Sequence, residues 1–268
     1  MLGSIASQQC GSAFAAHVFP VLGVALTACL RSAVGGVALA VIERPQMRGR
    51  SAQDFFAVTI FGLLIAGMNL SFYAAIARIP LSLAVAIEFL GPLGVAVYMS
   101  RRRVDLLWVA LAASGIVLFS GVSDSGLDAV GIGCALVTGA CWAAYIFVAK
   151  QVGRSWVGSQ GVTIGLAVAS VTLIPVALAT MHLGTIDVRT VLLICAVGGF
   201  AGALVFSLEL AALRRLSAGT YGVLASLEPA MAALAGVVLL GQGLSVTQLC
   251  AIVLVVIACL GAMGVRRS

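Results

Sequence analysis

Long apolar runs follow one another along the whole chain, and short links between them hold most of the polar and charged residues. A run of about 20 apolar residues is long enough to cross the hydrocarbon core of a bilayer. Inside that core every backbone N–H and C=O must bond within its own segment, so each run is expected to be a helix. The pattern therefore predicts an all-α membrane protein with ten transmembrane helices. Cutting the runs at their links gives 2–19, 22–42, 53–76, 80–99, 104–122, 127–149, 158–180, 188–211, 217–240 and 244–265.

The two halves of the chain share a sequence pattern. A shift of 137 positions brings Arg78 onto Arg215 and Pro92 onto Pro229, and the run after each arginine carries a glutamate. The alternative is that any two hydrophobic helices look alike to some degree. The matched arginine and proline make a chance similarity less favoured. We interpret the pattern as two five-helix repeats, and an odd number of helices in each repeat inverts the second copy relative to the first. The repeats are expected at 1–124 and 125–268.

Basic residues indicate the orientation, because cytoplasmic loops of membrane proteins are enriched in Lys and Arg. If the N-terminus faces the cytoplasm, the cytoplasmic links carry Arg44, Arg48, Arg50, Arg101, Arg102, Arg103, Lys150, Arg154, Arg266 and Arg267. The opposite links carry Arg78, Arg189, Arg214 and Arg215. The excess predicts that both termini are cytoplasmic, as an even number of helices requires.

Composition excludes several classes of protein. The chain is 62% hydrophobic and 9% charged, whereas a soluble domain has about 25% charged residues. The net charge of +6 is explained by the links, so it does not indicate a nucleic-acid partner. The seven cysteines form no C-x-x-C pair and the two histidines are far apart, which predicts no metal site and no disulfide framework.

Three glutamates lie inside predicted helices, each with apolar neighbours: Glu88, Glu209 and Glu228. A charged side chain at the centre of a bilayer costs about 2.5–3.5 kcal/mol or more. Such carboxyl groups are expected to face an internal cavity, to pair with a cation or to be protonated. The alternative is a glutamate near a helix end that reaches water. Tyr221 lies seven residues before Glu228, on the same helix face.

Proline and glycine accompany these glutamates. Because proline has no N–H, Pro92 leaves the carbonyl of Glu88 without its usual helical donor, and Gly91 lies on the same face. Pro229 directly follows Glu228. We expect helix breaks here, with a gating role.

Other polar residues within the predicted helices are candidates for the same pathway. Arg31 is the only base well inside a helix; it is expected to neutralise a glutamate or to hold a substrate carboxylate, the alternative being a side chain that reaches the interface. Asn69 and Tyr73 are four residues apart, and Trp142 and Tyr145 are three apart. Interhelical hydrogen bonds or the aromatic belt of the membrane interface are the structural alternatives.

Missing motifs narrow the function further. The only lysine, Lys150, is not part of a G-x-x-x-x-G-K phosphate loop, so transport by this chain would use a gradient rather than ATP. No G-x-S-x-G nucleophile motif is present either, and no cofactor is expected. Two alternatives to a transporter remain open: a membrane-embedded enzyme that modifies lipid, and a solute channel.

Several stretches resemble the EamA-type drug/metabolite transporter superfamily, and within it the branch that exports threonine and homoserine. The similarity runs from about residue 60 to the C-terminus. The matching stretches are Gly67–Tyr73, Pro80–Leu93, Ser100–Asp105, Gly139–Ile146, Ser207–Glu209 and Ser226–Ala230.

The resemblance implies two inverted five-helix repeats around a central cavity, formed by helices 1, 3, 4, 6, 8 and 9. It also implies alternating access and proton-coupled export of small neutral amino acids or related metabolites across the bacterial inner membrane. Export of another metabolite or drug is the alternative. The expected partners are a small-molecule solute, protons and membrane lipid, and a homodimer is left open. The first helix departs from the family, since it is polar at Ser7, Gln8 and Gln9.

Overall fold

The computed structural model describes residues 2–100, 105–120, 128–181, 187–205, 208 and 224–264, and within them helices are the only regular secondary structure. Four of these helices, α2, α3, α7 and α8, are each long and apolar enough to cross a membrane. The protein is thus a multi-pass membrane protein. The helices are α1 (Leu2–Leu22), α2 (Val24–Glu43), α3 (Ala52–Ile76), α4 (Leu81–Glu88), α5 (Leu90–Ser100), α6 (Asp105–Ser120), α7 (Ala129–Ser155), α8 (Gln160–Thr180), α9 (Val188–Gly198), the π-helix η1 (Gly199–Leu204), α12 (Glu228–Leu240) and α13 (Val246–Gly264).

The first two helices are joined by a single residue. Helix α1 continues through Pro20 to Leu22, beyond the end predicted from sequence, and Gly23 alone separates it from α2. Gly23 has a φ of 77°, a conformation that glycine adopts without steric cost. This one positive φ lets the chain reverse direction without a longer loop.

Three of the predicted helices are interrupted in the structure, one of them being 217–240, which has a turn at 226–227 before α12. The predicted helix 80–99 is broken at Phe89 into α4 and α5. Pro92 lacks the N–H that would bond the carbonyl of Glu88, so the helix opens at this turn. The predicted helix 188–211 changes from α9 to the wider η1.

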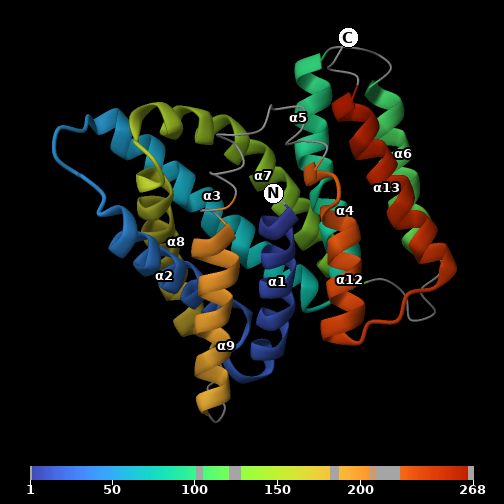
Figure 1. The fold of residues 1–268 in the computed structure, drawn as a ribbon, viewed down its shortest axis with the longest axis horizontal. Helices are drawn as coiled ribbons and strands as arrows, with labels where there is room; N and C mark the ends of the chain where they lie inside the picture. The colour runs from blue at the N-terminus through green and yellow to red at the C-terminus, as the bar shows by residue number, and fades with distance from the viewer. Residues whose placement is uncertain are drawn as a thin grey trace.

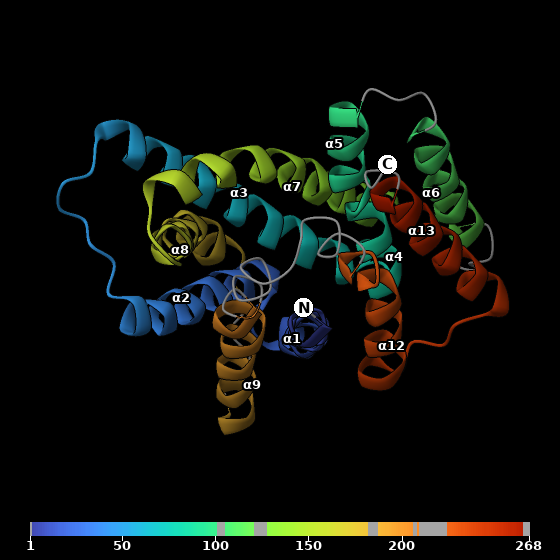
Figure 2. The same cartoon turned by 45° about the horizontal axis from the view of Figure 1, so that its top comes forward.

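Helices from both halves of the sequence pack together in two groups. Helix α2 packs against α8, and α3 packs against α7 and α8; α6 packs against α13, and α4 against α12. Figures 1 and 2 show these groups side by side, with α1 between them in contact with α9, η1 and α12. The start of α1 and the end of α13 lie toward the same side of the bundle (Figure 1).

Aspartates begin several helices. Ser51 and Asp54 form a capping box on α3, Asp128 accepts from the first N–H groups of α7, and Asp187 caps α9. Asp128 also accepts a hydrogen bond from Arg78 at 2.8 Å. That bond, together with the bonds from the helix N–H groups, holds the pKa of the Asp128 carboxyl below its ordinary value. The pair ties the link after α3 to the start of α7.

A second tie joins the α2–α3 and α7–α8 links. The Arg50 guanidinium lies over the Trp156 ring, 4.7 Å from its centroid, and donates to the carbonyl of Ser155. Ser159 donates to a carboxylate oxygen of Glu43 at 3.1 Å. These contacts fasten the ends of α2, α3, α7 and α8 to one another.

Candidate functional site

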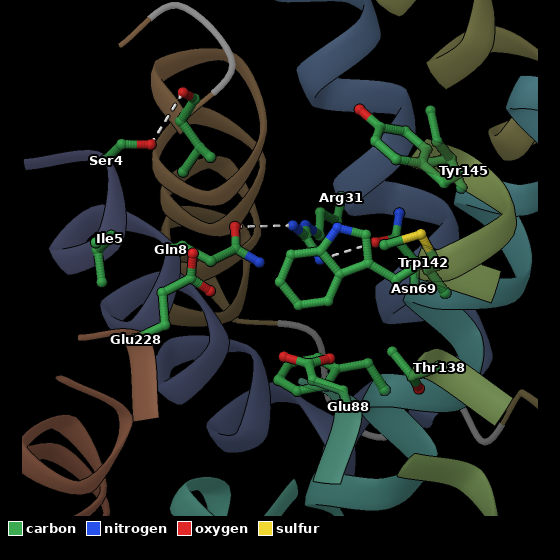
Figure 3. A pocket seen from close by; sticks show the side chains of 14 residues that line it. Ser4, Ile5, Gln8, Arg31, Asn69, Glu88, Thr138, Trp142, Tyr145 and Glu228 are labelled. Atoms are coloured by element: carbon green, nitrogen blue, oxygen red, sulfur yellow. Dashed lines mark hydrogen bonds between the residues drawn. The ribbon is translucent and has the colours of Figure 1, made fainter. Parts of the chain in front are cut away.

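A cavity lies where α1, α2, α3, α4, α7 and α12 meet (Figure 3). Its volume is about 860 Å³ including its open side. Charged, polar and aromatic side chains all contribute to the wall. The lining residues are Ser4, Ile5, Gln8, Arg31, Ile65, Met68, Asn69, Phe72, Glu88, Thr138, Trp142, Tyr145, Val205 and Glu228.

Arg31 is buried in the bundle, with 7% of its surface exposed, and does not extend to a membrane interface. Its Nη1 donates to Oδ1 of Asn69 at 2.9 Å, and its Nη2 donates to Oε1 of Gln8 at 3.1 Å and to the carbonyl of Ala201 at 2.9 Å. Asn69 in turn donates to Ser32 at 3.1 Å. The three acceptors that the described residues offer this buried cation are uncharged groups.

Glu88 lies at the helix break, and its position depends on glycine packing. The residue ends α4, is 8% exposed, and has Pro92 four positions later. A Cβ on Gly139 of α7 would lie 2.8 Å from the Glu88 carbonyl oxygen, and a Cβ on Gly91 would overlap the Gly139 backbone. The α4–α5 break therefore packs backbone against backbone on α7, which aims Glu88 at the cavity.

Glu228 approaches the cavity from the start of α12. It is the first residue of that helix and Pro229 is the second, so it lies at a helix N-terminus, where the helix dipole favours a negative charge. Helix α12 packs against α4, and Glu228 interacts electrostatically with Glu88. In Figure 3 both glutamates lie on the opposite side of the cavity from Tyr145.

Aromatic rings form another part of the wall. Trp142 contacts Phe89 edge to face, with centroids 5.0 Å apart, and Tyr145 stacks on Phe61 at 4.7 Å. Such pairs hold both rings in fixed orientations. Thr138, one turn before Trp142, is hydrogen-bonded to Ser71 of α3 at 2.8 Å. A ligand in the cavity would meet rigid aromatic faces on this side.

The structure brings most of the candidate residues together in this cavity: Arg31, Asn69, Glu88, Trp142, Tyr145 and Glu228 all line it. Tyr73 does not; it is fully buried behind Arg31, whose Cζ lies 5.5 Å from its ring centroid. The first turn of α5, after Glu88, contains Gly91 and Pro92. The first turn of α12, which begins at Glu228, contains Pro229. Glu209 and Tyr221 lie outside the described residues.

The family resemblance implied that the first helix contributes to the cavity, but none of its residues was singled out as a candidate. Ser4, Ile5 and Gln8 line the cavity, and Gln8 bonds Arg31. The signal was present, since polar residues inside an apolar helix are costly unless they have partners, but it was interpreted as a departure from the family pattern. The apolar lining residues, such as Met68 and Val205, carry no signal that separates them from other membrane residues.

Comparisons with known proteins identify the family of the chain. The EamA-like transporter family matches residues 129–264. The threonine/homoserine exporter RhtA of Escherichia coli K12 is 36% identical over the whole chain and 92% of its own length, and that of Salmonella typhimurium LT2 is 35% identical with the same coverage. One solved crystal structure superposes with a TM-score of 0.66 at 17% identity, covering 99% of this chain and 95% of the other; it concerns the fold alone. With a family match over half its length and full-length relatives above 30% identity, this chain belongs to the EamA-like transporter family.

Proposed function

We propose that the protein exports small neutral amino acids of the threonine and homoserine type, or related metabolites. The observation that carries the proposal is a single cavity holding a buried arginine together with Glu88 and Glu228. A free amino acid carries one carboxylate and one ammonium group, and burying either requires an opposite charge or hydrogen bonds. Arg31 would hold the carboxylate and the glutamates the ammonium. The names of the Escherichia coli and Salmonella relatives support this class of solute.

Proton coupling is the second part of the proposal. An intramembrane carboxyl group that alternates between protonated and ionised states can link solute movement to a proton gradient. Glu88 and Glu228 are the first candidates, because both line the cavity and interact with each other. Protonation of one glutamate would weaken its hold on the solute ammonium and so link release to the proton.

Alternating access by two inverted repeats, 1–124 and 125–268, is the third part. A turn at Phe89 interrupts the helix beside Glu88, and a turn at Ser226 precedes Glu228. The 137-residue shift places Phe89 on Ser226. Discontinuous helices at matching positions of two repeats are typical of substrate sites in transporters. The family match at 129–264 falls within the second of these repeats.

The proposed location is the bacterial cytoplasmic membrane, with both termini in the cytoplasm. The arginine-rich links on one side support this orientation. The start of α1 and the end of α13, which lie toward the same side (Figure 1), support it as well.

Counterflow in proteoliposomes tests the function. Vesicles loaded with unlabelled threonine or homoserine should accumulate labelled threonine faster than empty ones, and an imposed pH gradient should change net export. Glu88→Gln should abolish gradient-driven export while the protein remains in the membrane. Glu43→Gln, the same chemical change at a residue outside the cavity lining, should export normally.

Other results would redirect the proposal. Full gradient-driven export by Glu88→Gln would remove this residue from the mechanism. Passage of labelled solute down its gradient without counterflow would indicate a channel. Absence of exchange with any small amino acid would reject this class of solute, and a wider panel of metabolites would follow.

A further inference from the structure

The π-helix η1 has two carbonyl groups that accept hydrogen bonds from other helices. The N–H of Val205 would bond Ala201 in an α-helix but donates to the carbonyl of Gly202 instead. Ser7 donates to the carbonyl of Phe200 at 2.8 Å, and Arg31 donates to that of Ala201 at 2.9 Å. The wide form of this turn is therefore stabilised by α1 and α2.

Glycines allow these side chains to reach the turn. A Cβ on Gly11 of α1 would overlap the side chain of Ala201, and a Cβ on Gly35 of α2 would lie 3.2 Å from Cα of Gly202. The backbones of both helices thus pack directly against η1, with little room for a side chain at these two glycines. Single-turn π-helices of this kind occur frequently at functional sites.

Arg31 belongs to the turn and to the cavity at the same time. It lines the cavity, and among the described residues its hydrogen-bond acceptors are the Gln8 and Asn69 side chains and the Ala201 carbonyl, which are neutral. A guanidinium bonds a carboxylate about twice as strongly as a neutral acceptor and often through two parallel N–H groups. A carboxylate entering the cavity would therefore compete successfully for the Nη2 group that now holds Ala201.

We propose that a solute carboxylate binds Arg31 by displacing the Ala201 carbonyl, and that η1 then rearranges into an α-helical turn. The freed Ala201 carbonyl would accept the Val205 N–H, its ordinary α-helical donor. The inference rests on the proposed function and deepens it: the site selects solutes with a free carboxylate, and the carboxylate itself changes the structure of the helix.

The direction in which Ser7→Ala changes the affinity for threonine distinguishes the proposal from a purely structural role of the turn. Ser7 stabilises the wide turn but does not line the cavity. Removing its hydrogen bond should lower the free-energy cost of rearranging the turn. Threonine should therefore bind about fivefold more tightly, the factor that corresponds to one ordinary hydrogen bond. Threoninamide, which keeps the ammonium group but lacks the carboxylate, should bind Ser7→Ala and the unchanged protein equally.

Ser12→Ala is the matched control, because in the described part of the chain the Ser12 hydroxyl bonds within α1, to the carbonyl of Gln8. Its affinity for threonine should match that of the unchanged protein. Binding would be measured by calorimetry on purified full-length protein in detergent. Unchanged or weaker threonine binding by Ser7→Ala would overturn the proposal, while counterflow by the unchanged protein would leave the proposed export function standing.

A second measurement needs no variant. Hydrogen exchange of the η1 amides, followed by mass spectrometry, should change when threonine is added and stay constant with threoninamide at the same site occupancy. Identical exchange with both compounds would overturn the proposal, because the carboxylate would then have no effect on the turn. Failure of both compounds to bind would reject the proposed solute class and this inference with it.

Discussion

Gly139→Ala should impair transport without preventing membrane insertion. The added Cβ would lie 2.8 Å from the carbonyl oxygen of Glu88 and 3.3 Å from its Cα, whereas ordinary contacts begin at 3.4 Å. The nearest atoms are backbone, so no side chain can rotate away. Helix α4 must therefore move from α7 by about 0.6 Å, the difference between 3.4 and 2.8 Å, and Glu88 moves with it.

Two effects of this displacement set the expected magnitude. Overpacking a well-packed contact destabilises a protein by about 1–3 kcal/mol. A misplacement of 1 Å in a functional group can cost about 100-fold in rate, so a shift of about 0.6 Å should lower the kcat/KM of threonine transport by about tenfold. Initial rates of counterflow in proteoliposomes measure this loss, and thermal unfolding in detergent measures the stability.

Gly133→Ala is the control on the same helix. Gly133 is exposed and an added Cβ there meets no atom within 4 Å, so alanine should transport normally and stabilise the helix by up to about 1 kcal/mol. Normal transport by Gly139→Ala would refute the argument that glycine packing positions Glu88. An equal loss in both variants would refute it too, because the effect would then follow from any alanine in α7.

Two further predictions concern the links. Asp128→Asn keeps a helix-capping side chain but loses the charge paired with Arg78. Folding lowers the pKa of the Asp128 carboxyl. The ionised carboxylate therefore stabilises the folded protein above the ordinary pKa of 3.8, and this stabilisation is lost as the pH falls through the folded-state pKa. Thermal unfolding temperatures should therefore differ between variant and unchanged protein at pH 6 and converge below pH 3.8; a constant difference would contradict this. Arg50→Lys loses the planar stacking on Trp156, worth about 0.5–1 kcal/mol, and should unfold at a temperature between those of the unchanged protein and Arg50→Ala, whereas equal unfolding of all three would show that the stacking contributes nothing.

The sequence alone predicted that the protein is helical and crosses the membrane many times. The apolar runs carry this prediction because hydrocarbon leaves each segment to bond its own backbone. It also identified Glu88, Glu228, Arg31 and Asn69, because a charged or amide side chain among apolar neighbours is costly without a partner. These signals are local and can be seen without knowing the fold.

Only the tertiary structure decided which of these groups meet. Arg31 bonds a carbonyl 170 residues away and a glutamine 23 residues away, and no periodicity of the sequence specifies such pairs. The break at Phe89 could be anticipated from Pro92, but its packing on Gly139 depends on the approach of α7. Likewise two carbonyl groups of η1 accept hydrogen bonds from Ser7 and Arg31 on other helices, and sequence reasoning, which depends on local hydrogen bonds, does not foresee such long-range ones.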